Sequence, residues 1–177
     1  MARSFDARLR TLYGRRMSPN PIVFREAGRA DMPGIAHVRT SVTENHLSRA
    51  QLASRGITNE SVAASFEADS KGWVADVGGR IVAFAIADRA SRSVFALFVL
   101  PGYEGRGLGS WLLDLAARWL WENGAERIWL TTGAGTRAAE FYQRHGWTMT
   151  ADVKGELRFE CQRPVAAGLP IEQSGSG

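Results

Sequence analysis

The chain has 177 residues, 45% of them hydrophobic, which is enough for one domain with an apolar core. Its single cysteine, Cys161, excludes an internal disulfide and a metal site built from cysteines, and no metal is expected. Residues 1–20 carry five arginines and one acid, which accounts for the whole net charge of +4 and leaves the remainder neutral. A basic surface across the domain, as nucleic-acid-binding proteins use, is therefore not expected.

Hydrophobic periodicity predicts alternating strands and helices. Strands are assigned where apolar residues alternate or run together, and helices where they recur every three or four positions. In chain order the expected elements are a strand at 22–26, helices at 32–42 and 60–68, strands at 73–77, 81–87 and 93–100, a helix from 108, a strand at 127–132, a helix to 144, and strands at 147–153 and 156–162. This order is typical of a single α/β domain with a mixed sheet.

Capping and turn residues support these boundaries. Asp31 is suited to begin the first helix, Thr58 or Asn59 the second, and Thr136 the last. The pair Gly78-Gly79 satisfies a tight hairpin turn, because glycine adopts positive φ without strain.

Both ends of the chain are predicted to lie outside the domain, which we place at residues 21–163. Residues 1–20 form a basic arm, with apolar residues at helical spacing before Pro19. Residues 164–177 are rich in Pro, Ala, Gly and Ser and are expected to be flexible. No apolar run approaches the roughly 20 residues of a membrane helix, and no secretory signal follows the first arginines. We expect a cytoplasmic protein without membrane contact.

The most informative stretch is residues 93–119. Seven consecutive apolar residues, 94–100, predict a strand buried on both faces. An eight-residue loop, 103–110, follows with three glycines and one arginine. The next helix should turn one apolar face inward, made of Leu108, Trp111, Leu112, Leu115, Ala116, Trp119 and Leu120. A strand, a glycine-rich loop and a helix present free N–H groups and a positive helix end to phosphate, so the stretch predicts a pyrophosphate cradle.

Two common nucleotide motifs do not fit this loop. The spacing Gly105-x-Gly107-x-Gly109 lacks the last interval of the dinucleotide pattern G-x-G-x-x-G. A phosphate-binding P-loop needs G-x-x-x-x-G-K-[ST], and no such lysine is present.

The loop instead resembles the acetyl-CoA loop of the Gcn5-related N-acetyltransferase (GNAT) superfamily. That signature, [QR]-x-x-G-x-[GA] after a strand ending V-x-P, stands here as residues 104–109 after Val99-Leu100-Pro101, with Glu104 at the first position. Residues 138–147, AAEFYQRHGW, resemble the family's A-x-x-F-Y-x-x-x-G-[FW] motif. The resemblance implies a single domain with a mostly antiparallel sheet of six to seven strands and helices on both faces.

By position, the resemblance also implies which residues contact acetyl-CoA. The strand before the loop should splay away from its neighbour and offer backbone groups to pantetheine, and the loop should line the pyrophosphate. Gly135 stands where many members carry a CoA-contacting asparagine, and Thr136 is expected to supply that contact. The implied set is Leu97, Phe98, Val99, Gly105, Arg106, Gly107, Leu108, Gly109, Ser110, Thr136 and Tyr142.

The catalytic groups are implied in the same way. Tyr142 resembles the family's general acid, and a phenol with a pKa near 10 is protonated at neutral pH, as that role needs. The strand position that often carries a glutamate base is Phe95-Ala96 here. Glu44 is our choice for the base, with His46, Asp88 or an ordered water as alternatives. The acceptor is expected to contact Glu44, Asn45 and His46.

The resulting interpretation is an enzyme that moves the acetyl group of acetyl-CoA to a primary amine by direct attack. The acceptor is a small molecule or a peptide, and the protein could form a homodimer. Two alternatives stay open. One is a non-catalytic CoA-binding or sensor module, because the strand glutamate is absent. The other is an acetyltransferase directed to aminoacyl-RNA, in which the basic arm contacts the RNA.

Overall fold

The computed structural model describes residues 20–164 and places seven strands in one sheet. The strands are β1 (Ile22–Glu26), β2 (Ser70–Val77), β3 (Arg80–Asp88), β4 (Ser93–Val99), β5 (Arg127–Gly133), β6 (Thr148–Val153) and β7 (Glu156–Gln162). The helices are η1 (Arg29–Asp31), α2 (Met32–Ser41), α3 (Arg49–Ser54), α4 (Asn59–Ser65), α5 (Leu108–Glu122) and α6 (Arg137–Arg144). The predicted arm helix and most of the predicted flexible tail lie outside the described residues.

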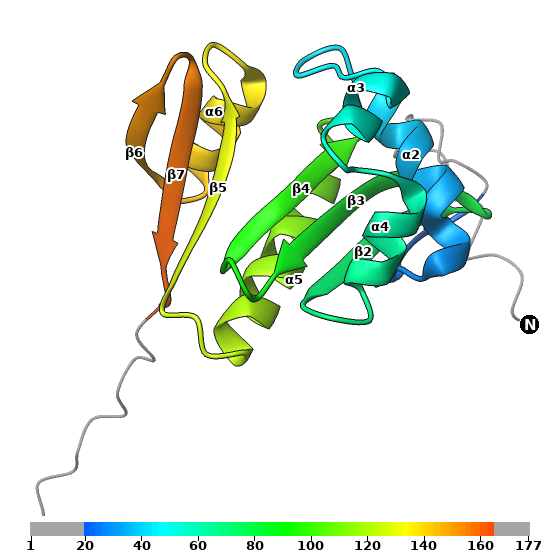
Figure 1. Ribbon diagram of the computed structural model, residues 1–177, viewed down its shortest axis with the longest axis horizontal. Helices are drawn as coiled ribbons and strands as arrows, with labels where there is room; N and C mark the ends of the chain where they lie inside the picture. Colours follow the sequence, from blue (N-terminus) through cyan, green and yellow to red (C-terminus); the bar gives the residue numbers. More distant parts are fainter. Residues whose placement is uncertain (1–19, 165–177) are drawn as a thin grey trace, which may run out of the picture.

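The sheet has the strand order β1-β2-β3-β4-β5-β7-β6, and every neighbouring pair except one is antiparallel. The exception is β4–β5, which is parallel and joined through a single pair, Ser93 with Trp129. Beyond that pair the two strands diverge (Figure 1). The sheet is therefore split into β1–β4 and β5–β7, and the expected mixed, mostly antiparallel fold with a splayed central strand is confirmed.

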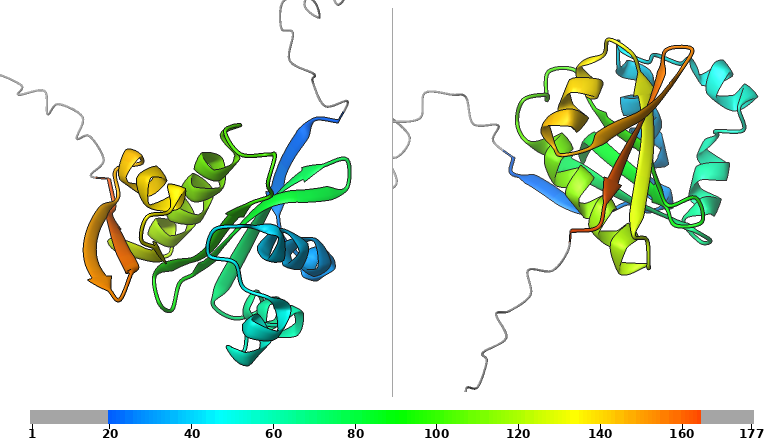
Figure 2. Two further views of the ribbon diagram at one scale, coloured as in Figure 1. Left: turned by 90° about the horizontal axis from the view of Figure 1, so that it is seen from above. Right: turned by 90° about the vertical axis from the view of Figure 1, so that its left-hand side faces the viewer.

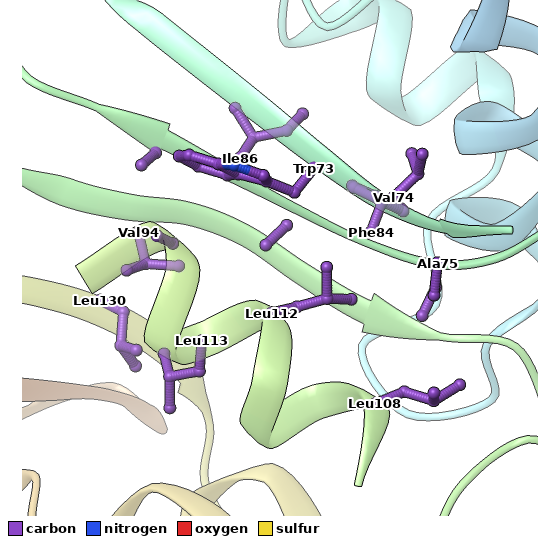
Figure 3. Packing of buried hydrophobic residues seen from close by; sticks show 14 of the residues in the cluster. Trp73, Val74, Ala75, Phe84, Ile86, Val94, Leu108, Leu112, Leu113 and Leu130 are labelled. Atoms are coloured by element: carbon purple, nitrogen blue, oxygen red, sulfur yellow. The ribbon is translucent and has the colours of Figure 1, made fainter. Parts of the chain in front are cut away.

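Helices cover both faces of the β1–β4 half. In Figure 2 α2 and α4 lie on one face, while α5 crosses the other. Strand β3 between them is buried from Ile81 to Ala87, as a strand covered on both sides should be. Figure 3 shows how α5 joins the two halves, with Leu112 toward β3 and β4 and Leu113 toward Leu130 of β5.

Most predicted boundaries are confirmed within a few residues, and β1 and β7 agree fully. Thr58 and Thr136 cap their helices by accepting a backbone N–H at 3.1 and 3.3 Å. Asp31 precedes α2 but does not cap it with its side chain, because its carboxylate binds Arg25 and the amide of Gly28.

The six-residue helix α3 was not predicted. It is short, and only Leu52 on it is buried, so its apolar periodicity is weak. A capping box marks its start, since Ser48 and Gln51 exchange side-chain and backbone hydrogen bonds at 2.8 and 3.2 Å. The spacing Ser48-x-x-Gln51 is therefore the sequence feature from which the start of α3 could have been predicted.

Two predictions about burial were wrong. Strand β4 was expected to be buried on both faces, but it is fully buried only where it begins, and Phe95 is 52% exposed. The reason is that β5 diverges from β4 after Ser93. Trp111 was expected inside but is 56% exposed, lying at the sheet edge with its ring 5.6 Å from that of Phe24. Within residues 20–164, no helix combines the length and apolar character needed to cross a bilayer.

Candidate active site

A pocket of about 530 Å³ occupies the gap between the two halves of the sheet. Its walls are β4, the loop before α5, the first turn of α5, the end of β5 and helix α6. The segment after α2 closes one side with Val42, Thr43, Glu44 and Asn45. Most of the sequence-predicted residues thus meet in one place, although they come from distant parts of the chain, and Arg106, His46 and Thr136 lie outside the lining.

The β4 wall presents backbone groups that have no strand partner. The Leu100 amide donates to the Val82 carbonyl at 2.8 Å, which fixes the direction of the alternating groups along β4. Phe98 therefore points its backbone toward β3, whereas the N–H and C=O groups of Leu97 and Val99 point away from β3 into the gap. Only Ser93 of β4 pairs with β5, so these groups are free for a ligand.

The loop before α5 offers a second set of free donors. Gly105 and Gly107 have φ values of 71° and 79°, a conformation in which an L side chain is strained. A Cβ on either residue would meet no atom within 4 Å, so the space beside them is open. Within residues 20–164 the amides of 105–110 donate no backbone hydrogen bond, and they lie at the positive end of the 15-residue α5.

The loop's two charged side chains both bond to the backbone of Gly102 at the start of the loop. Glu104 accepts from the Gly102 amide at 2.7 Å, which ties the loop back on itself. Arg106 donates to the Gly102 carbonyl at 3.0 Å, and its guanidinium lies 4.9 Å from the centre of the Tyr103 ring. Arg106 is not among the residues that line the pocket.

Tyr142 lines the pocket and is otherwise enclosed. Its ring packs against Phe141, Trp147 and Phe159 at centroid distances of 5.3 to 6.0 Å, and 6% of the residue is exposed. Burial raises the pKa of this phenol above its ordinary value, because the low-dielectric surroundings disfavour the phenolate. No group of residues 20–164 hydrogen-bonds to its hydroxyl, which leaves that proton available to a ligand.

The Glu44 carboxylate, which was predicted as a candidate base, is hydrogen-bonded to Arg137 across the gap. It accepts from the backbone amide of Arg137 at 3.0 Å and from the Arg137 side chain at 3.2 Å. The same guanidinium lies 3.5 Å from Glu104, so it connects the segment after α2, helix α6 and the α5 loop. Sequence reasoning missed Arg137, and nothing local marks it, because its partners are far away along the chain.

The neighbours of Glu44 have different surroundings. Asn45 donates from Nδ2 to the Thr132 hydroxyl at 3.2 Å and lines the pocket. His46 does not line the pocket, and its Nδ1 lies 3.1 Å from the Val42 carbonyl. Thr136 is also absent from the lining, since its hydroxyl caps α6 and donates to the Gly133 carbonyl at 2.8 Å.

Of two other titratable side chains, His145 lies in the pocket and Asp88 lies outside it. His145 lines the pocket, with Nδ1 donating to the Phe141 carbonyl at 2.8 Å and Nε2 lying 2.8 Å from the Ser110 hydroxyl. It therefore orients Ser110 in the first turn of α5. Asp88 lies outside the pocket, where its carboxylate accepts from the amides of Ala90 and Ser91 in a turn. In the described part of the chain no three His, Cys, Asp or Glu side chains gather as a metal site requires.

Comparison with known proteins decides the family. The profile of the acetyltransferase (GNAT) family matches residues 40–147, a span that includes the α5 loop and Tyr142. The chain belongs to the GNAT acetyltransferase family. An uncharacterized N-acetyltransferase of Methanocaldococcus jannaschii is 31% identical over 96 residues, which cover 49% of this chain and 42% of that protein.

Solved GNAT structures share the fold at low sequence identity. The PaiA N-acetyltransferase of Thermoplasma acidophilum, solved in complex with coenzyme A, gives a TM-score of 0.69 at 14% identity, covering 81% of this chain and 99% of that one. A ribosomal-protein-alanine N-acetyltransferase of Brucella melitensis gives 0.63 at 18% identity, with 80% and 99% coverage. These similarities concern the fold alone.

Proposed function

We propose that this GNAT protein is an N-acetyltransferase that transfers the acetyl group of acetyl-CoA to a primary amine. The observation that carries the proposal is one continuous pocket with two sets of unpaired backbone groups. The Leu97 and Val99 groups on β4 suit the amides of a pantetheine arm, which binds like an added strand. The free amides of 105–110 suit a diphosphate at the helix end. The PaiA structure, which contains coenzyme A, supports this assignment.

Different groups of the chain would then carry out the separate steps of acetyl transfer. Acetyl-CoA supplies the thioester that the amine attacks. Free N–H groups on β4 would stabilise the negative charge that develops on the carbonyl oxygen. The Tyr142 hydroxyl would protonate the departing thiolate, since burial keeps the phenol in its acid form.

The amine must also lose a proton, and among residues 20–164 the pocket offers no unengaged carboxylate for that step. Glu44 and Glu104 are the acids that line the pocket, and both contact Arg137. Glu44, at the acceptor side, would therefore act in one of two ways. It would take the amine's proton itself, or it would hold in place the segment beside which a water takes the proton. This same feature favours, as a second candidate, a CoA-binding module without turnover.

Two measurements on the full chain separate these functions. Calorimetry with acetyl-CoA tests the pocket assignment, and a thiol assay of CoA release with a panel of primary amines tests catalysis. Saturable acetyl-CoA binding together with amine-dependent CoA release is expected. Binding without release from any amine would identify the non-catalytic module, and absence of binding would contradict the proposal altogether.

A further inference from the structure

Helix α6 ends beside the start of α5, and a hydrogen bond between two side chains joins them. Nε2 of His145 lies 2.8 Å from the hydroxyl oxygen of Ser110, and the centre of the His145 ring lies 4.1 Å from that of Phe141. All three residues line the pocket. Ser110 belongs to the first turn of α5, where the free amides of 105–110 form the proposed diphosphate site. The imidazole and the hydroxyl therefore lie beside a site that is expected to hold negative charge.

The other ring nitrogen of His145 decides which atoms carry hydrogen. Nδ1 lies 2.8 Å from the Phe141 carbonyl oxygen, which can only accept, so Nδ1 is the donor of that bond. In the neutral ring Nε2 is then an acceptor, and the hydrogen between the two side chains belongs to the Ser110 hydroxyl. While His145 is neutral, the Ser110 oxygen has only lone pairs to offer a ligand, and lone pairs are unfavourable beside a phosphate oxygen.

Protonation of His145 reverses the direction of this hydrogen bond. An imidazolium donates from both nitrogens, so Nε2 then donates to the Ser110 oxygen. The hydroxyl hydrogen of Ser110 is released and can donate to a phosphate oxygen, while the ring adds a positive charge beside it. Imidazole is the side chain whose charge ordinarily changes between pH 5 and 8. The exchange requires one proton and no rearrangement of the backbone.

The other charges around this pair leave the imidazolium without a protein counter-ion. Among residues 20–164, no carboxylate forms an ion pair with His145. The charged side chains on the neighbouring segments are Glu140 and Arg144 on α6, which pair at 3.8 Å, Glu104 and Arg106 on the loop, which both bond to Gly102, and the exposed Asp114 one turn after Ser110 on α5. Arg144 also lines the pocket, so this end of it favours an anion. A bound diphosphate would supply the missing negative charge.

Resting on the acetyl-CoA site of the proposed function, we propose that His145 takes up a proton when acetyl-CoA binds, and that Ser110 couples this proton to the diphosphate. Ser110 donates to a phosphate oxygen, whereas His145 is a positioning residue that acts through Ser110. The complex then holds the proton more tightly than the free protein does. By linkage, the affinity for acetyl-CoA rises as the pH falls from 8 to 6.

Calorimetry with acetyl-CoA, repeated in buffers of different ionisation enthalpy, counts the protons taken up on binding. The wild-type protein should take up a fraction of a proton near neutral pH, and its Kd should fall about tenfold from pH 8 to pH 6. The amide of His145→Gln can donate to Ser110 but cannot titrate. Its Kd at pH 7 should therefore stay within about threefold of wild type, while the change of Kd with pH shrinks to less than about twofold. Ser110→Ala should bind about tenfold more weakly and lose most of the proton uptake.

Two comparisons isolate the contribution of His145. A phosphate monoester such as that on the ribose of acetyl-CoA titrates at about pH 6, but this contribution is common to all the proteins and cancels in the difference between wild type and variant. His37→Gln removes an exposed histidine of α2 that does not line the pocket, and it should change neither the affinity nor the proton uptake. Because His145 is itself exposed, its replacement should leave the fold intact, which thermal unfolding checks.

Acetyl-CoA binding with the same proton uptake in wild type and His145→Gln would overturn the inference and leave the acetyltransferase proposal standing. Proton uptake that persists in Ser110→Ala would overturn it as well, since the hydroxyl would then not couple the two. If acetyl-CoA does not bind at all, the proposed function fails together with the inference. The measurement needs no turnover, so it decides the inference even if no amine releases CoA.

Discussion

At the scale of single residues, Tyr142 and Glu44 line the same pocket but differ in whether their polar groups have partners. Tyr142 is held by three aromatic neighbours, yet its hydroxyl is left without a partner in the described part of the chain. Glu44, in contrast, has both carboxylate oxygens engaged by Arg137. The first arrangement suits a group that gives a proton to a ligand, and the second suits a group that fixes two segments relative to each other.

Removing the hydroxyl of Tyr142 tests the first role. We expect Tyr142→Phe to lower kcat about a hundredfold, because a positioned general acid typically contributes that much, and to leave the affinity for acetyl-CoA nearly intact. Steady-state CoA release and calorimetry measure the two quantities. Because burial raises the pKa of the phenol above its usual value near 10, wild-type kcat should show no loss from Tyr142 ionisation between pH 7 and 10. An unchanged kcat in the variant would remove Tyr142 from the mechanism.

Glu44→Gln distinguishes a base from a bridge. Glutamine keeps the size and one acceptor oxygen for Arg137 but cannot take a proton, so a bridging role predicts a loss of less than about tenfold in kcat, as exposed ion pairs contribute little. The acidic limb of the pH–kcat profile should persist. A much larger loss, with disappearance of that limb, would instead assign Glu44 as the general base. Arg89→Ala, which breaks an exposed pair with Asp69 outside the pocket, is the control.

At the scale of elements, α5 shows how one helix serves folding and binding together. Leu108 and Leu112 bury one stripe against the sheet, and Leu113 extends the contact to Leu130 beyond the split. The start of the same helix is left open, because Gly107 turns the chain at φ 79° and no side chain in the described part of the chain caps it. The core thus fixes the direction of the helix, and the uncapped end leaves free the amides that we propose bind the diphosphate.

A matched pair of glycine variants separates these two roles. Gly107 and Gly124 flank α5 at φ 79° and 87°, and a Cβ at either would meet open space. Alanine at each should destabilise the fold by about 1–2 kcal/mol through left-handed strain. Only Gly107→Ala should also weaken acetyl-CoA binding, since its methyl group occupies the space beside the amides. Denaturant unfolding and calorimetry give both values, and equal acetyl-CoA affinities in the two variants would contradict the cradle.

At the scale of the whole molecule, the pocket exists because strands β4 and β5 pair only where β4 begins. The two halves meet at Ser93 and Trp129, at the core contacts of α5, and at the Glu44–Arg137 bridge. Between these points the pocket lies, lined by residues from 42 to 145. We propose that residues 21–163 constitute the acetyltransferase domain and that the basic arm is not needed for its chemistry.

Deleting residues 1–19 tests that division. The family match spans residues 40–147 and the described pocket lining runs from residue 42 to residue 145, so CoA release and thermal stability should match those of the full chain. Both are measured beside a version in which the five arginines of the arm are replaced by glutamine, which keeps its length. A loss of activity confined to an RNA-linked amine would favour the aminoacyl-RNA alternative and make the arm part of substrate recognition.

The sequence by itself determined most of the elements and the glycine-rich loop before α5, because periodicity, caps and glycine turns act over a few neighbouring residues. Residues 104–109 and Phe141-Tyr142 identified the family before any contact was known, and Thr58 and Thr136 marked helix starts that the structure retains. Only the tertiary structure decided what those elements face. Glu44 and Arg137, which are hydrogen-bonded, are 93 positions apart in the sequence. Likewise, the guanidinium of Arg39 on α2 stacks on the ring of Phe98 on β4. No local pattern records such contacts, since they arise from the way β4 and β5 separate and from the segments that close the gap.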